Sequence, residues 1–152
     1  MSKLAFIFPG QGAQKAGMGK DFYENSEAAR SFFDQAQKIL DFDLKEMCFG
    51  EHEELNLTEY TQPCMVSVCL AIVQELKKRG INPDITAGLS LGEYAAVAAA
   101  GGMNELDAIK LVRRRGILMQ STVPAGEGAM AAVLGLDAKK IEEILESFEN
   151  VW

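Results

Sequence analysis

Residues 85–93 read ITAGLSLGE, a short apolar run that is broken by Ser90 between two glycines. The residues before the serine favour a strand, and the alanine-rich residues after it favour a helix. A strand, a tight turn and a helix in this order form a nucleophile elbow, which exposes a serine oxygen at the edge of a sheet. Ser90 is therefore a candidate nucleophile, although the G-x-S-x-G spacing also fits a structural turn that caps a helix.

The predicted helix after Ser90 would assist a nucleophile in two ways. The N-terminal end of a helix carries partial positive charge, which favours an alkoxide. The backbone N–H of Leu91 would also point at a reacting carbonyl. A serine nucleophile needs a base, and the one histidine of the chain, His52, lies upstream in an acidic segment. We interpret His52 as a surface residue, which leaves Ser90 without a base in this chain.

Strands and helices alternate along the remaining sequence. We expect a buried strand over residues 3–10, another over 84–88 and a third over 128–136, with an irregular segment at 41–62. The expected helices cover residues 21–40, 63–80, 91–101, 105–120 and those after Asp137. This alternation predicts a parallel α/β architecture.

The C-terminal residues form an apolar helical stripe made of Ile141, Ile144, Leu145 and Phe148. The last residues, FENVW, are typical of a turn that leads into a new strand. A stripe and a strand without partners would be an unusual end for a finished domain, so we interpret the chain as truncated. Exposed stripes at the cut also predict poor solubility of this part alone.

The glycine-rich loop after the first strand does not fit a nucleotide site. A dinucleotide fingerprint needs a third glycine where Lys15 stands, and a Walker loop needs lysine where Met18 follows Gly17. The loop would still lie at the carboxyl edge of a strand, where ligands bind in open α/β sheets. Its backbone N–H groups could therefore serve an oxyanion.

Two arginines of the helix at 105–120 fall near apolar residues on a helical wheel. Arg115 lies between Ala108, Leu111 and Met119, on the arc that should face the core. A guanidinium there needs an anion, because an unpaired buried charge is costly. The wheel leaves a structural ion pair and a ligand clamp equally open for Arg115. Arg113 lies nearer the polar edge of the wheel, from which its side chain could reach solvent.

The composition describes an acidic globular protein that uses no disulfides. The net charge of −7 argues against binding to nucleic acid or to an anionic membrane surface. Three cysteines without a C-x-x-C pair indicate buried thiols in a reducing compartment. No signal peptide or membrane span is recognised, so we expect a cytoplasmic protein, and no metal-binding spacing occurs.

Five segments of the chain resemble malonyl-CoA:acyl carrier protein transacylases in their order and spacing. They are FIFPGQGAQKAGMG, TQP, GLSLGEYAAVAAAGG, RRRGILMQ and GAMAAVLGL. The resemblance covers nearly the whole chain, and it implies relatives about twice as long. Their catalytic histidine lies in a Gly-x-x-His segment of a second half that is absent from this sequence.

The resemblance implies an α/β-hydrolase-like large subdomain with an inserted ferredoxin-like small one, both incomplete here. Residues 1–127 would belong to the large subdomain and residues 128–152 would start the small one. It also implies transfer of a malonyl group from coenzyme A to the phosphopantetheine thiol of acyl carrier protein in fatty acid biosynthesis. Neither a cofactor nor a metal is implied, and we expect a monomer at full length.

The resemblance also assigns roles to individual residues. Ser90 would carry the acyl group as an ester, and the N–H groups of Gln11 and Leu91 would form the oxyanion hole. Arg115 would hold the malonyl carboxylate, and Gln62 would line the site.

The chain departs from the family pattern at Leu89, where histidine is common. Two other hypotheses remain open from the sequence. One is a non-catalytic fragment that must be complemented by a second half. The other is a serine esterase of the α/β-hydrolase type.

Overall fold

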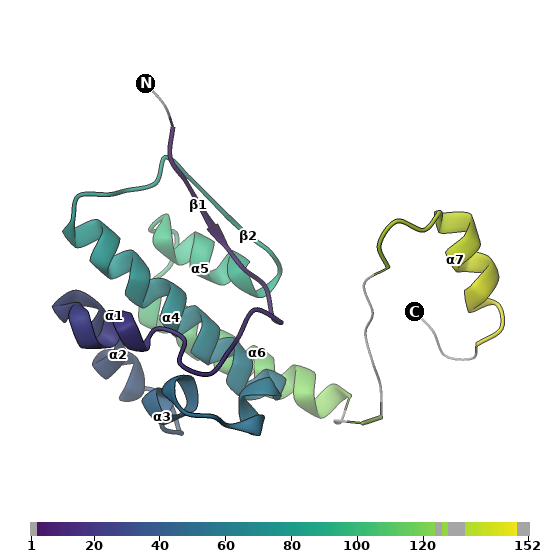
Figure 1. Cartoon of the computed structure of the whole chain (residues 1–152), viewed down its shortest axis with the longest axis horizontal. Helices are drawn as coiled ribbons and strands as arrows, with labels where there is room; N and C mark the ends of the chain where they lie inside the picture. The colour runs from purple at the N-terminus through teal and green to yellow at the C-terminus, as the bar shows by residue number, and fades with distance from the viewer. Residues whose placement is uncertain (1–2, 124–125, 128–132, 149–152) are drawn as a thin grey trace.

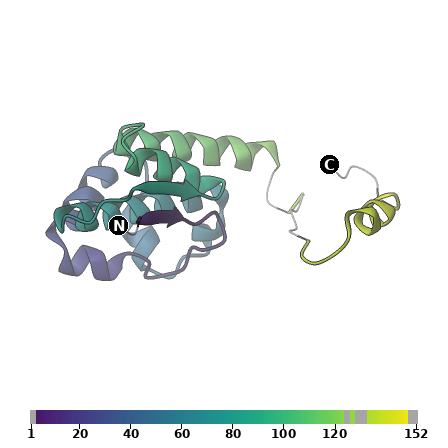
Figure 2. The ribbon, with the colours of Figure 1, turned by 90° about the horizontal axis from the view of Figure 1, so that it is seen from above.

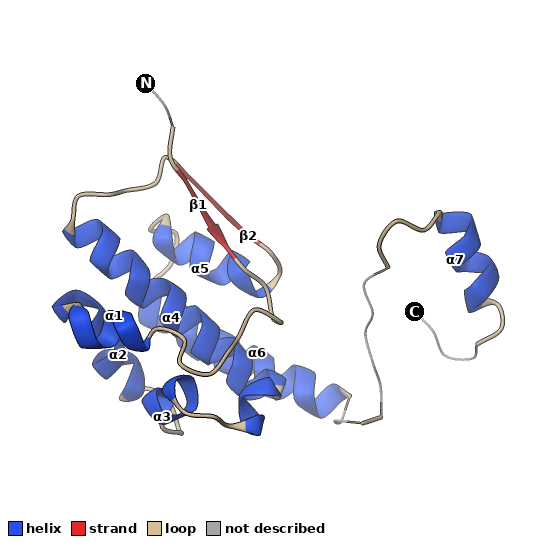
Figure 3. Ribbon diagram, in the orientation of Figure 1, coloured by secondary structure: helices blue, strands red, loops and turns tan. Residues whose placement is uncertain are grey.

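In a computed structural model the described residues are 3–123, 126–127 and 133–148, and they form several helices with one short pair of strands at their side (Figures 1 and 3). In chain order the elements are β1 (Ala5–Phe8), α1 (Lys20–Asn25), α2 (Glu27–Gln37), α3 (Leu44–Phe49), the 3₁₀ helix η1 (Glu53–Asn56), α4 (Thr58–Lys78), β2 (Ile85–Gly88), α5 (Leu91–Ala99), α6 (Glu105–Thr122) and α7 (Ala138–Leu145).

The two strands are parallel, as the alternation of strands and helices predicts. Ala5 pairs with Ile85 and Phe8 pairs with Gly88, so the strands end together at the Ser90 turn. Successive side chains of a strand point to opposite faces. Phe8 is buried on the helix side, but Ile7 is 78% exposed and Ile85 is 56% exposed on the other face. The prediction of a buried strand is therefore wrong for one of its faces in the described structure.

Helix α4 forms the centre of the core, and α2, α5 and α6 all pack against it. Its middle residues are buried because these neighbours surround it on several sides. Leu70, Ala71 and Cys64 have no exposed surface. The expected end of this helix near residue 80 is confirmed, since Gly80 has φ of 74° and the Ile81 N–H returns to the Leu76 carbonyl at 2.9 Å.

The helix expected over residues 21–40 is two helices. Ser26 stands between them in extended conformation, and its hydroxyl accepts a hydrogen bond from the Ala29 N–H at 3.1 Å. This bond is an N-cap for α2, so the capping preference of serine ends one helix and begins the next. The hydrophobic spacing continues across Ser26, and therefore periodicity alone missed the break.

The segment expected to be irregular, residues 41–62, contains α3, η1 and the start of α4. The prediction that α4 begins at Pro63 is also wrong, because the helix begins at Thr58 and Pro63 lies inside it. Proline has no N–H, so the carbonyl four residues earlier cannot receive its usual helical bond. That carbonyl belongs to Glu59, and it receives a hydrogen bond from Arg113 at 2.8 Å instead.

The C-terminal helix α7 lies apart from the other helices in the two views (Figures 1 and 2). The helix expected after Asp137 is confirmed, and the Asp137 carboxylate caps it by accepting a hydrogen bond from the Lys139 N–H at 2.9 Å. The helix ends at Leu145, before Phe148, and it has no buried residue. Of the strand expected at 128–136, residues 133–136 do not form a strand, and residues 128–132 lie outside the described residues, as does most of FENVW.

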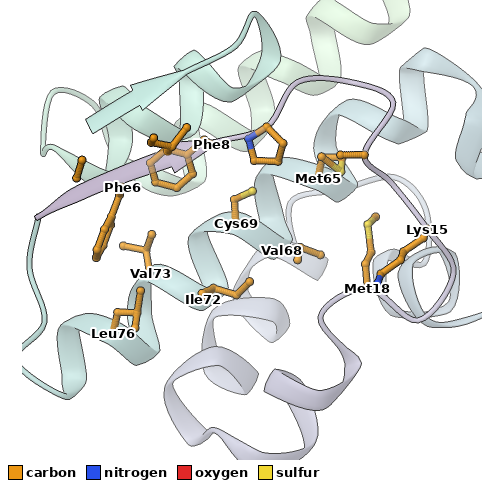
Figure 4. A pocket seen from close by; sticks show the side chains of 14 residues that line it. Phe6, Phe8, Lys15, Met18, Met65, Val68, Cys69, Ile72, Val73 and Leu76 are labelled. Carbon is orange, nitrogen blue, oxygen red and sulfur yellow. The ribbon is translucent and has the colours of Figure 1, made fainter. Parts of the chain in front are cut away.

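An apolar trough of about 420 Å³ lies between β1 and α4 (Figure 4). Phe6 and Phe8 line it from the strand, and Cys69, Ile72 and Leu76 line it from the helix. The trough and the exposed sheet face are the two parts of the described molecule where strand residues are not covered by packed helices.

Candidate functional site

Ser90 occupies a strained turn between β2 and α5. Its φ is 49° and its ψ is −100°, and no other described non-glycine residue has a positive φ. Such a backbone costs on the order of 1–3 kcal/mol and occurs mainly at functional sites. The turn is held from both sides, because the Leu89 N–H donates to the Phe8 carbonyl at 3.1 Å and the Gly92 N–H donates to the Leu89 carbonyl at 2.9 Å. The Ser90 residue is exposed.

The two glycines that flank Ser90 are required by close backbone contacts. A Cβ atom on Gly88 would lie 2.1 Å from the carbonyl carbon of Gly92. A Cβ atom on Gly92 would lie 2.3 Å from the carbonyl oxygen of Phe8. The start of α5 therefore rests directly on the ends of both strands, and only glycine fits at these two positions.

Arg115 reaches the turn from α6. Its Nη2 donates to the Ser90 hydroxyl oxygen at 3.3 Å, and its Nη1 donates to Gln62 Oε1 at 2.7 Å. The guanidinium carbon lies 5.6 Å from the centre of the Tyr94 ring. Among the described residues no carboxylate lies within ion-pair distance of Arg115. The cation is thus beside the serine and remains open to an acidic ligand.

The predicted core position of Arg115 needs a correction. The side chain is half-buried, and its wheel neighbours Leu111 and Met119 are 46% and 42% exposed. This arc of α6 faces a surface that is open in the described structure. The wheel identified the apolar neighbours, but it could not show whether other residues cover them.

Gln62 links Arg115 to the loop that follows β1. It is fully buried on α4, and its Nε2 donates to the Thr58 hydroxyl and to the Met119 sulfur, each at 3.3 Å. The Thr58 hydroxyl in turn donates to Gln11 Oε1. Four segments that are distant in the sequence are therefore joined by one chain of polar groups, from Ser90 through Arg115, Gln62 and Thr58 to Gln11.

Two N–H groups at this site are free to serve an oxyanion. Leu91 is the first residue of α5, so its N–H has no partner inside the helix. The Gln11 N–H makes no backbone hydrogen bond within the described ranges. The Gln11 loop also approaches the turn closely, because a Cβ atom on Gly10 would lie 3.0 Å from the Leu89 carbonyl oxygen.

Arg113 has a different environment from Arg115, and it does not use the path to solvent that the wheel leaves open. Its side chain is 13% exposed, and it bonds both carboxylate oxygens of Asp41 at 2.9 Å and Glu59 Oε2 at 3.1 Å. The guanidinium also lies over the rings of Phe42 and Tyr60. Burial would lower the pKa of Arg113, but the bond to Asp41 and the nearby carboxylates raise it. Arg113 therefore has a structural role, as the cation of ion pairs with Asp41 and Glu59.

His52 does not take part in this polar chain. Its Nε2 pairs with Glu46 Oε1 at 3.0 Å near α3, which agrees with the surface role inferred from the sequence. Within the residues that the structure describes, no group of three histidine, cysteine or acidic side chains is placed to hold a metal. The same residues contain no helix that is long and apolar enough to cross a membrane.

Sequence reasoning missed Thr58 and Tyr94. Thr58 lies one helical turn before Gln62, so helical spacing would have placed both side chains on one face. The prediction began the helix at Pro63, and this removed Thr58 from the helix altogether. Tyr94 lies one turn after Ser90 in α5, and the same spacing could have placed its ring near the serine.

An exposed serine in a strained turn, with free N–H groups and an open cation beside it, is suited to carry a negatively charged acyl group. The chain belongs to the acyl transferase domain family, which matches residues 5–152.

Relatives and solved structures agree with this membership. The chain is 49% identical to a malonyl CoA-acyl carrier protein transacylase of Bacillus subtilis over 147 residues, which are 96% of this chain and 46% of that protein. A crystal structure of the transacylase from Clostridium perfringens has a TM-score of 0.85 at 44% identity, covering 95% of this chain and 46% of that one.

A third similarity is to a malonyl-transacylase solved in complex with a type II PKS acyl-carrier protein. The TM-score is 0.86 at 39% identity, and the match covers 95% of this chain and 48% of that one. The chain therefore spans about half the length of the relatives that it matches.

Proposed function

We propose that this chain supplies the nucleophile and the carboxylate-binding residue of a malonyl-CoA:acyl carrier protein transacylase. The observation that carries the proposal is the position of the Arg115 guanidinium, 3.3 Å from the Ser90 hydroxyl and without a carboxylate partner in the described structure. A malonyl thioester that reacts at Ser90 ends in a carboxylate, and a planar guanidinium can bind that group through two parallel hydrogen bonds.

The reaction would proceed in two balanced steps. The Ser90 oxygen attacks the thioester carbonyl, the bond from carbon to the coenzyme A sulfur breaks, and the serine proton passes through a base to the leaving thiolate. The phosphopantetheine thiol of the carrier protein then attacks the malonyl ester, and its proton returns to Ser90. The N–H groups of Gln11 and Leu91 would stabilise the negative oxygen in each step.

The base for both steps would come from outside residues 1–152. His52 is the one histidine of the chain, and it is paired with Glu46. The family resemblance assigns the base to a histidine in the second half of the domain. We therefore expect this chain alone to be inactive, which retains the hypothesis that it must be complemented by that half.

Arg115 would set the preference for malonyl over acetyl groups. An acetyl group has no carboxylate, so its binding would leave the guanidinium with only the Gln62 and Tyr94 contacts. Removal of water from the closed site would then be costly for the unpaired charge. The carboxylate of a malonyl group would pair with Arg115 and so offset that cost.

For the fold, we propose that residues 1–127 belong to an α/β-hydrolase-like large subdomain and that residues 128–152 begin a ferredoxin-like small one. The parallel pair β1–β2 with its serine turn supports the first assignment. Strain at Ser90 and the free Leu91 N–H also fit the nucleophile elbow of that fold. The boundary at residue 128 rests on the family resemblance.

An acyl carrier protein is the proposed second substrate. The name of one structural neighbour describes a malonyl-transacylase in complex with such a protein. This chain has a net charge of −7, so docking of an acidic carrier would need a local basic surface. Much of that surface would have to lie in the remaining half of the domain. The proposed chemistry needs neither a metal nor a bound cofactor.

The test uses a chimera in which residues 1–152 are followed by the C-terminal remainder of the Bacillus subtilis relative. The chimera and the chain alone are mixed with radiolabelled malonyl-CoA, and the label is located by peptide mapping. We expect label on Ser90 in the chimera, its transfer to carrier protein, and none on the chain alone or on Ser90→Ala. A folded chimera without label would refute the transfer function, and release of free malonate without transfer would favour the esterase.

The same assay tests the role of Arg115. We expect Arg115→Ala to lower kcat/KM for malonyl-CoA by roughly 10- to 100-fold, the size of one or more charged hydrogen bonds, and to raise it for acetyl-CoA. Arg114→Ala is the matched control, since Arg114 is an exposed neighbour on the same helix. Unchanged selectivity in Arg115→Ala would refute its role as the clamp.

A further inference from the structure

The polar groups between Arg115 and Gln11 can donate in only one direction. A guanidinium has donors but no acceptor, so the atom of Gln62 that faces Arg115 must be its carbonyl oxygen, at 2.7 Å. The amide nitrogen of Gln62 must then face Thr58 and donate to its hydroxyl oxygen, at 3.3 Å. The Thr58 proton is left to donate to Gln11 Oε1. The fixed charge of Arg115 thereby sets the orientation of two amides and one hydroxyl.

Burial makes this order strict at its centre. Gln62 has no exposed surface, so water cannot replace a lost partner at low cost. Its oxygen is satisfied by Arg115, and its nitrogen by Thr58 and the Met119 sulfur. A flipped amide would place an N–H against the guanidinium and an acceptor against the sulfur. The observed orientation is therefore the one that satisfies every polar atom of Gln62.

Thr58 is the group that connects the two functional parts of the site. We call the series of hydrogen bonds from Arg115 through Gln62 and Thr58 to Gln11 the relay. Thr58 lies at the first turn of α4, and its backbone N–H is not part of the relay because it donates to Gln120 Oε1 at 3.2 Å. Its hydroxyl is the one contact in the relay between the buried Gln62 and the exposed Gln11 loop. Gln11 is also the residue whose backbone N–H is proposed for the oxyanion hole.

We propose that Thr58 is a positioning residue that couples the carboxylate clamp at Arg115 to the oxyanion loop at Gln11. The inference rests on the transacylase function proposed above. The fixed charge of Arg115 orients Gln62, and the relay thereby keeps the Thr58 proton directed at Gln11 whichever acyl group is bound. The Gln11 loop is thereby held against α4, with its N–H in place for the developing oxyanion. Loss of the hydroxyl releases the loop without removing a group that touches the substrate.

The test compares Thr58→Val with Thr58→Ser in the chimera. Valine keeps the shape of threonine but has no hydroxyl, whereas serine keeps the hydroxyl and loses a methyl group. We expect Thr58→Val to lower kcat for malonyl transfer by about fivefold to tenfold, the size of one hydrogen bond, with little change in KM. Thr58→Ser should restore most of the rate. Thr122→Val is the matched control, because among the described residues that hydroxyl bonds to the Leu118 carbonyl of its own helix and to no other group.

A double-mutant cycle shows whether Thr58 acts through Arg115. The rate of acetyl transfer is measured for Thr58→Val with Arg115 present and with Arg115→Ala. If the relay operates, the valine substitution slows transfer in the first case and has almost no effect in the second, because the orienting charge is gone.

The outcomes separate this inference from the function on which it rests. A chimera that is folded but takes no malonyl on Ser90 refutes the transacylase proposal, and it also refutes the coupling of Arg115 to Gln11 through Thr58. Chimera that transfers malonyl while Thr58→Val has wild-type kcat refutes the coupling alone. Equal losses in both Arg115 backgrounds, or a lowered melting temperature that serine does not restore, would show that Thr58 is only structural.

Discussion

Arg113 and Arg115 are two residues apart on α6, and the groups that face them separate their roles. Arg113 is saturated by Asp41 and Glu59, so it has no free donor pair for a substrate carboxylate. Arg115 meets an amide, a hydroxyl and an aromatic face, which leave its charge uncompensated. The Arg113 site also depends on Pro63, because proline frees the Glu59 carbonyl that Arg113 binds.

The Arg113–Asp41 pair predicts a pH dependence of stability. The hydrogen bond from Arg113 lowers the pKa of Asp41 below its ordinary value of 3.8. The unfolded chain therefore takes up this proton at higher pH than the folded chain does, so acid favours unfolding. The contribution is complete above about pH 5 and is lost as the pH falls through the folded pKa. Because Asp41 is exposed, the effect should be small.

Urea unfolding of the chain and of Asp41→Asn across the range pH 2.5–7 measures this effect. The two proteins should differ at neutral pH and converge in acid. Asp107→Asn is the control, since Asp107 forms only an exposed pair with Lys110. A difference between the chain and Asp41→Asn that persists at the lowest pH would contradict the assignment.

At the residue scale, the sequence predicted what short-range geometry determines. The Ser90 turn and its two glycines follow from one strand, one turn and one helix, and the structure agrees with them. The surroundings of Arg113 could not be predicted, since they depend on Asp41, Phe42 and Tyr60, which are distant in sequence. A helical wheel orders the residues of one helix and contains no information on what faces them.

At the scale of elements, the site depends on how closely α6 approaches α4. A Cβ atom on Gly116 would lie 2.7 Å from the Glu59 Cα and 2.8 Å from the Thr58 carbonyl oxygen. Both atoms belong to backbone, which cannot move aside as a flexible side chain can. This contact brings Arg115, the preceding residue, within reach of Gln62 on α4.

Gly116→Ala should therefore destabilise the fold although alanine favours helices. Alanine is better than glycine in a helix by about 1 kcal/mol, so propensity alone predicts a gain. Overpacking against backbone costs about 1–3 kcal/mol, and we expect a net loss in the free energy of unfolding. Ser121→Ala is the control, because within the described part of the chain that hydroxyl bonds to its own helix alone. A more stable Gly116→Ala protein in urea titrations would show that the two helices can separate freely.

Element boundaries were predicted less well than the elements themselves. Ser26 and Pro63 explain the main errors, and in opposite ways. Ser26 breaks a continuous apolar pattern because its hydroxyl caps the next helix. Proline is typical of a helix start, but here Arg113 donates a hydrogen bond to the Glu59 carbonyl that Pro63 leaves free, and the helix begins earlier, at Thr58. A bond to another helix cannot be predicted from local sequence.

At the scale of the whole molecule, two apolar surfaces of the strand pair lack a cover in the described structure. One is the sheet face with Ile7 and Ile85, and the other is the trough between β1 and α4 (Figure 4). Parallel sheets are stable when both faces are buried. Since the chain spans about half of its relatives, we expect the remaining half of the domain to cover these surfaces.

Cys69 reports whether the trough becomes covered. It lies in the trough on α4, and burial raises its pKa from 9.0 to about 11. Because the thiolate is the reactive form, iodoacetamide should alkylate Cys69 in the folded chain at pH 8 about a hundredfold more slowly than in urea. In the chimera the rate should fall further, since the added half would exclude the reagent as well.

Mass spectrometry of the alkylated peptides measures each cysteine separately. Cys48 and Cys64 have no exposed surface, so they should stay unmodified in both folded proteins and provide the internal reference. The two effects can be separated by raising the pH. Deprotonation of Cys69 raises its alkylation rate and so removes the slowing caused by the high pKa, whereas the slowing caused by exclusion of the reagent does not change with pH. If Cys69 reacts equally fast in the chain and in the chimera at every pH, the trough is not where the second half packs.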